Sequence, residues 1–77
     1  MDENLKLLTV AGALLKIGRD DVALEPARMR ELMTAAHEVI LQAIRHRMGL
    51  KPARYGFATA GLVAGIEAHH AIQYAAR

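Results

Sequence analysis

Each of the two prolines of the chain follows a glycine within eight residues, and these two breaks divide the sequence into three segments. Gly18 precedes Pro26, and Gly49 precedes Pro52. Glycine is common just after the last turn of a helix, where it adopts a left-handed conformation cheaply, and proline suits the first turn. The pattern predicts an all-α, small three-helix domain. The expected helices are a short one over residues 3–17 and two longer ones over 26–48 and 53–76.

Apolar periodicity supports the three helices and is clearest in the second segment, because side chains three and four positions apart share one side of a helix. Its expected inner face consists of Met29, Leu32, Met33, Ala36, Val39, Ile40, Ala43 and Ile44. Glu38, Gln42 and Arg45 fall on the opposite, polar side, and Leu41 falls outside the apolar face. The first segment has an apolar arc over about half its circumference, which is broad enough to touch more than one neighbour.

Length and composition limit what such a chain can build alone. With 77 residues it forms one domain at most, and a domain of this size buries only about 60% of the surface that its unfolded chain exposes. Without cysteine, disulfides and thiolate metal sites are excluded. Small domains that lack such supports often rely on a partner chain, so the sequence predicts a helical bundle completed as a homodimer. We expect a cytoplasmic protein without a membrane span, since the longest apolar run, residues 57–66, is too short.

The third segment carries a wide face made mostly of alanine and glycine, with Gly61 and Gly65 four positions apart. Small side chains allow another helix backbone to approach closely. We expect this face and the ridge beside it, together with part of the first helix, to mediate self-association. The candidate residues are Phe57, Gly61, Leu62, Ala64, Gly65, Ile66, Ala68, His69 and Ile72. The alternative is that the same face packs within the chain, against the first two helices.

Glu67 and His70 have the Glu-x-x-His spacing that places a carboxylate and an imidazole on one side of a helix, as in carboxylate-bridged metal bundles. Such a site needs further carboxylates from facing helices, and Glu31 and Glu38 point away from the apolar face of the second helix. The pair is therefore a weak metal candidate, and the simpler interpretation is a solvated polar arc. We expect no cofactor.

A basic turn joins the second and third segments, whereas acidic residues outnumber basic ones over residues 1–44. Its cations are Arg45, Arg47, Lys51 and Arg54. One hypothesis is that they contact DNA or RNA phosphates, as in a helix-turn-helix protein. Few side chains that could read bases follow the turn, however, and cations are also favoured at the C-terminus of a helix. We expect the turn to steer an acidic protein partner.

Catalytic motifs are missing from the sequence. It holds neither cysteine nor serine, none of its three threonines lies in a recognisable nucleophile motif, and it lacks a glycine-rich phosphate loop. The predicted function is therefore that of a small non-enzymatic interaction protein, such as an adaptor, a chaperone-like subunit or an inhibitor of another protein. The alternatives are a nucleic-acid-binding regulator using the basic turn and a metal-binding bundle using Glu67 and His70.

Overall fold

The computed structural model describes residues 3–20 and 24–75, with the side chains up to residue 70. Three α-helices make up the fold: α1 (Glu3–Asp20), α2 (Pro26–Arg47) and α3 (Phe57–Ala75). The described part of the chain contains no strand. The all-α, three-helix prediction is thereby confirmed.

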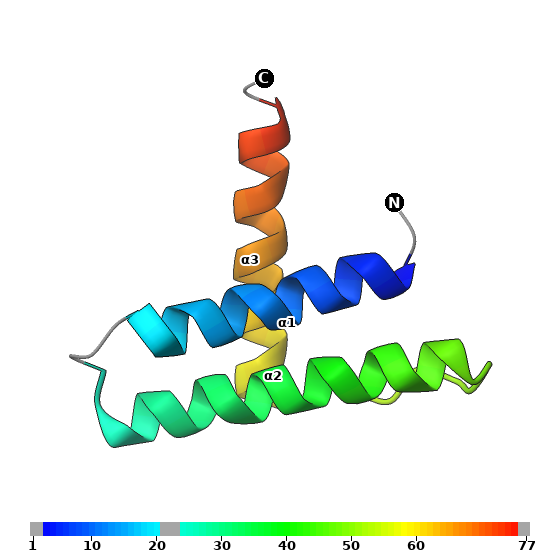
Figure 1. Ribbon diagram of the computed structural model, residues 1–77, viewed down its shortest axis with the longest axis horizontal. Coiled ribbons are helices and arrows are strands. Elements are labelled where there is room, and N and C mark those ends of the chain that lie inside the picture. Colours follow the sequence, from blue (N-terminus) through cyan, green and yellow to red (C-terminus); the bar gives the residue numbers. More distant parts are fainter. Residues whose placement is uncertain (1–2, 21–23, 76–77) are drawn as a thin grey trace.

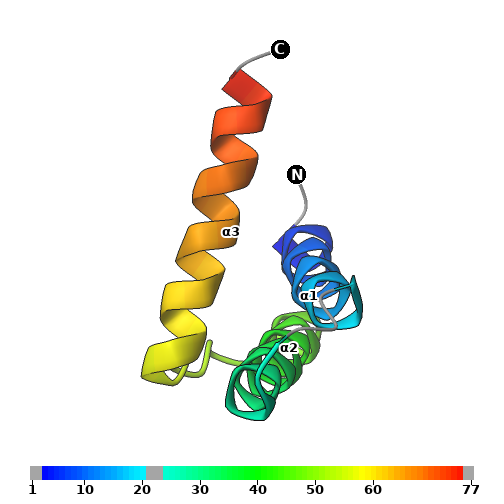
Figure 2. The same ribbon diagram turned by 90° about the vertical axis from the view of Figure 1, so that its left-hand side faces the viewer.

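Two of the helices form a layer, and the third helix crosses this layer. α1 and α2 run side by side in opposite directions, and α3 crosses them steeply on one side (Figure 1). Figure 2 looks along α1 and α2 and shows the first half of α3 beside them, while its second half extends beyond the pair. The other side of this two-helix layer is left open by the described residues.

A small core lies where the three helices meet. Its buried members are Val10, Ala11, Leu14, Leu32, Ala35, Ala36, Val39 and Val63. Leucine and valine supply the apolar area, and the alanines leave room for α1 and α2 to lie close together. The expected inner face of the second helix is confirmed at its centre, but several flanking residues, among them Met33 and Ile44, are exposed.

The ends of α1 and α2 show two different uses of glycine. Gly18 was expected to end the first helix, but α1 continues to Asp20. At Gly18 a side chain would meet the Met29 sulfur at 3.3 Å, so the residue serves the close approach of α2. Gly49 does end α2 as expected, with a φ of +73°. The Gly49 N–H donates to the His46 carbonyl, and the Leu50 N–H donates to the Arg45 carbonyl at 3.0 Å, which satisfies the last carbonyls of the helix.

The third helix begins at Phe57, four residues later than the sequence predicts, because residues 50–56 form a linker held along α2. Arg45 Nε donates to the Lys51 carbonyl at 2.8 Å. The Gln42 amide donates to the Ala53 carbonyl and accepts from the Ala53 N–H at 2.9 Å. Arg45 and Gln42 share one side of α2 with Glu38. The Glu38 carboxylate accepts a hydrogen bond from the Gly56 N–H at 3.1 Å.

Glu38 thereby fixes the start of α3. Gly56 precedes the first helical residue, and its carbonyl accepts the first hydrogen bond of the helix, from Ala60. A carboxylate at this end also interacts favourably with the helix dipole. We call Glu38, Gln42 and Arg45 the polar row of α2. It holds the linker at Lys51, Ala53 and Gly56, up to the residue before α3 begins.

Replacing Gln42 with alanine tests the polar row. The change removes both hydrogen bonds to Ala53, and we expect a loss of about 1–2 kcal/mol in the free energy of unfolding, since each bond contributes about 0.5–1.5 kcal/mol. Urea unfolding followed by circular dichroism measures this loss. Glu31→Ala on the same helix is the matched control, because it removes only an exposed ion pair with Arg28. Equal losses in the two variants would mean that Gln42 does not hold the linker.

Candidate interaction surfaces

The small-residue face of α3 points to solvent in the folded chain. A side chain placed at Gly61 or Gly65 would meet no atom within 4 Å, and Ala64 and Ala68 are exposed. α3 instead packs on the layer through Thr59 and Val63, with Leu62 and Ile66 partly buried beside them. The alternative that this face packs against the first two helices is therefore wrong.

Phe57 stands at the start of that solvent-facing side and is 99% exposed. An isolated apolar ring in water is unfavourable, and aromatic side chains are frequent anchors of interfaces. Together with Gly61, Ala64, Gly65 and Ala68 it forms what we call the outer face of α3. These residues are spaced three and four apart, so they share one side of the helix.

Three further residues proposed for self-association, Leu62, Ile66 and His69, lie beside the outer face rather than on it. Leu62 and Ile66 contact the core, so only part of each side chain is available to a partner. His69 is exposed, and its ring centre lies 6.3 Å from that of His70. The side chain of Ile72 lies outside the described residues.

Of the four cations of the basic turn, one holds the linker and three are exposed. Arg45 binds the Lys51 carbonyl and thereby holds the linker. Arg47, Lys51 and Arg54 are exposed, and the ion pairs found among the described residues involve other parts of the chain. Three cations within eight residues remain available to an acidic partner.

The proposed metal pair is not joined by other ligands. Glu67 and His70 are both exposed, and the described residues hold no group of three histidine or acidic side chains arranged to bind a metal ion. Glu67 contributes instead to a hollow where all three helices meet the linker.

This junction hollow has a volume of about 280 Å³. Its lining residues are Glu3, Leu7, Gln42, His46, Leu50, Pro52, Tyr55 and Glu67. Burial raises the pKa of Tyr55 above its usual value, and the negative charges of Glu67, Glu3 and Glu38 raise it further. The phenol is therefore protonated at neutral pH and closes one side of the hollow as a neutral group.

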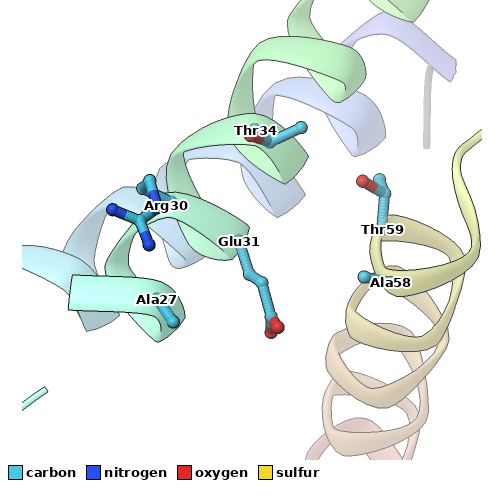
Figure 3. Close-up of a pocket in the computed structure, with 6 residues that line it drawn as sticks. All are labelled: Ala27, Arg30, Glu31, Thr34, Ala58 and Thr59. Carbon is cyan, nitrogen blue, oxygen red and sulfur yellow. The ribbon is translucent and has the colours of Figure 1, made fainter. Parts of the chain in front are cut away.

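A second hollow, of about 270 Å³, opens where α2 and α3 diverge (Figure 3). Its lining residues are Ala27, Arg30, Glu31, Thr34, Ala58 and Thr59. Glu31 pairs with Arg28 at 3.0 Å, and Figure 3 shows that Arg30 points away from α3. In this hollow Glu31 is thus already paired, and Arg30 is turned outward.

Large apolar side chains are also exposed along α1 and along α2 up to its C-terminal end. They are Leu5, Leu8, Leu15, Ile17, Met33, Leu41, Ile44 and Met48. The broad apolar arc of the first helix and the position of Leu41 outside the inner face of the second predict part of this exposure. No described helix combines the length and apolarity that a bilayer crossing requires.

The geometry of these surfaces is the basis for assigning a function. Comparison of the chain with protein-family models, with curated proteins and with solved structures finds no match.

Proposed function

We propose that this chain is a small non-enzymatic interaction module that self-associates through the outer face of α3. The observation that carries the proposal is the 99% exposure of Phe57 at one end of an open row of glycine and alanine. A second copy of α3 laid against this row buries the ring and the row together. The homodimer is cytoplasmic in this proposal and requires no cofactor.

The physical basis is that small side chains make close contact at low entropic cost. Glycine and alanine lose almost no side-chain rotamer freedom on burial, so a contact between two such rows retains most of its dispersion energy. The second half of α3 extends beyond the α1–α2 layer, which leaves its sides accessible to a partner helix (Figure 2). A dimer of this kind presents two copies of every other surface to further proteins.

The basic turn adds the second part of the proposed function. Arg47, Lys51 and Arg54 stand exposed beside the linker, where they attract an acidic protein partner before contact. Charges of this kind mainly raise the association rate and are screened by salt. The module then acts as an adaptor or an inhibitor by occupying the surface of its partner.

Sedimentation equilibrium tests self-association directly. We expect the apparent mass to rise from the 8.4 kDa monomer toward twice that value as concentration increases. Gly65→Leu is expected to weaken association about tenfold or more, since a large side chain in a close contact costs about 1–3 kcal/mol. The isolated chain has room for this side chain, so its circular dichroism is expected to stay unchanged.

Thr9→Leu is the matched control, because it also adds a leucine at an exposed helical position, but on α1. It is expected to leave association unchanged. A monomeric mass at all concentrations up to about 1 mM, where even an interaction of about 4 kcal/mol is detected, rejects the proposal.

A further inference from the structure

All three helices and the linker line the junction hollow, so it is a feature of the folded chain rather than of a single helix. α1 and α2 contribute two lining residues each, the linker contributes three, and α3 contributes Glu67. Its volume of about 280 Å³ has room for about nine waters, since one water occupies about 30 Å³ in the liquid. The hollow therefore accommodates a small organic group.

Glu3 and Glu67 bring two negative charges to the hollow, and no cation of the described residues pairs with either. The ion pairs found in the part of the chain that the structure describes lie toward the other end of the α1–α2 layer. The two carboxylates belong to different helices, so the fold, and not a run of acidic sequence, brings them to one hollow. A ligand with a positive charge supplies what this hollow lacks.

Tyr55 and His46 add two further polar groups. Within the described residues the Tyr55 hydroxyl has no hydrogen-bond partner. His46 Nδ1 lies 2.7 Å from Asn4 Oδ1, and an amide oxygen only accepts, so this nitrogen carries the proton. The other nitrogen of the neutral ring, Nε2, is then an acceptor. Apart from the Gln42 amide, which holds Ala53, the polar groups of the hollow are thus mainly hydrogen-bond acceptors.

The charges that reach the hollow are negative, although the basic turn adjoins it. The pKa of Tyr55 is raised mainly by burial, and the charges that raise it further are those of Glu67, Glu3 and Glu38. Among the lining residues that the structure describes, none belongs to the four cations of the basic turn. The hollow and the turn are therefore two regions of opposite charge.

The rest of the lining is apolar. Leu7, Leu50 and Pro52 line the hollow together with the Tyr55 ring, and Leu7 also packs against the core. An alkyl chain buries apolar area against such a wall, and an aromatic ring attracts a cation placed over its face. An ammonium group carries three hydrogen-bond donors and no acceptor, which matches the acceptors of the hollow.

We propose that the junction hollow binds a primary ammonium group on a short alkyl stem. Glu3 and Glu67 balance its charge, and the apolar wall holds its stem. A divalent metal ion suits the hollow less well, because the described residues hold no group of three histidine or acidic side chains arranged to bind one. The inference goes beyond the proposed function, since it assigns a ligand to residues outside the outer face of α3. The ammonium belongs either to a free amine or to a lysine side chain of a partner protein.

Titration of the full chain with n-butylamine tests the site, because its four-carbon stem equals that of lysine. The NMR signals of Leu7 and Tyr55 report occupancy of the hollow. We expect saturable shifts and an affinity at least about tenfold higher than that for n-butanol, which has the same size but no charge. This preference should fall as salt rises, since it is electrostatic.

Variants locate the site. Glu3→Gln and Glu67→Gln each remove one charge and keep the size of the side chain. Each is expected to weaken binding of n-butylamine at least about threefold, and the double variant at least about tenfold, while the affinity for n-butanol stays unchanged. Glu31→Gln is the matched control, because it also removes an exposed carboxylate but lines the other hollow. It is expected to leave the affinity for n-butylamine unchanged, and circular dichroism is expected to be the same in all these variants.

A blocked lysine, N-acetyl-lysine methylamide, separates the two sources of the ammonium group. Binding within about tenfold of n-butylamine means that the hollow accepts a lysine side chain of a partner protein. Weaker binding than this means that the ligand is a free amine, because the backbone of the blocked lysine is then excluded. Either result supports a site for the ammonium group.

Three results overturn this inference. They are the lack of a saturable shift at up to about 50 mM n-butylamine, equal affinity for n-butylamine and n-butanol, and full affinity in the glutamine double variant. Sedimentation equilibrium reports on the outer face of α3 and not on the hollow. Failure of the ammonium site and failure of the proposed function are therefore distinguishable.

Discussion

Leu14→Ala is expected to lower the free energy of unfolding by about 2–5 kcal/mol, the range found when a buried leucine is truncated and a cavity remains. Leu14 is fully buried at the centre of the core, where α1 meets the rest of the fold. A domain of 77 residues has a total stability of roughly 4–12 kcal/mol. The substitution therefore removes a large share of the stability, and thermal unfolding monitored by circular dichroism should show a markedly lower midpoint.

The next residue supplies the control. Leu15 belongs to the same helix and has the same side chain, but it is 42% exposed. Leu15→Ala is expected to change the free energy of unfolding by less than about 1 kcal/mol, because little apolar area is lost from the core. If the two variants lose stability equally in dilute solution, α1 is rotated differently from the structure described above.

The sequence predicts the helices and their approximate ends well, because these depend on neighbouring residues. The apolar spacing of α2 identifies its inner face, and Gly49 marks its end because a left-handed residue follows the last turn. Periodicity predicts the inner face of α1 less closely. Leu8 and Leu15 share its apolar arc with Leu14, but only Leu14 reaches the core.

The linker is the clearest feature that the sequence does not reveal. Glu38 and Gln42 read as outward-facing polar residues, yet both hold backbone atoms more than ten residues further along the chain. Spacing rules describe contacts within one helix, and these hydrogen bonds join different segments. Pro52 is consistent with a helix start, but the hydrogen bonds to Ala53 keep that residue outside α3.

The rotation of α3 about its own axis also cannot be predicted from the spacing of its residues. Residues 57–66 are apolar or small on nearly all sides, so periodicity favours no single face. The prediction that glycine and alanine face a close neighbour followed from side-chain size alone. In the folded chain Val63 is turned inward and the small residues are turned outward, and Glu38 holds the residue that precedes the helix.

Adjacent substitutions on α3 test this rotation. Val63 is 7% exposed between α3 and the layer, and Val63→Asp places a charge there without a partner. We expect it to lower the free energy of unfolding by about 3 kcal/mol or more, because desolvation of an unpaired charge adds to the lost apolar contacts. Detachment of α3 would also uncover Leu32 and Val39, so increased binding of an apolar dye is a second measurement.

Ala64→Asp is expected to affect self-association strongly and the stability of the monomer little. Ala64 is exposed on the outer face of α3, so the folded monomer is expected to lose no more than about 1 kcal/mol, mostly through helix propensity. In sedimentation equilibrium, however, the same change is expected to abolish self-association, because each copy brings an unpaired carboxylate to the contact. If Ala64→Asp unfolds the monomer as strongly as Val63→Asp does, the small residues pack inside the chain. The two neighbours therefore separate the surface that folds the monomer from the surface that joins two copies.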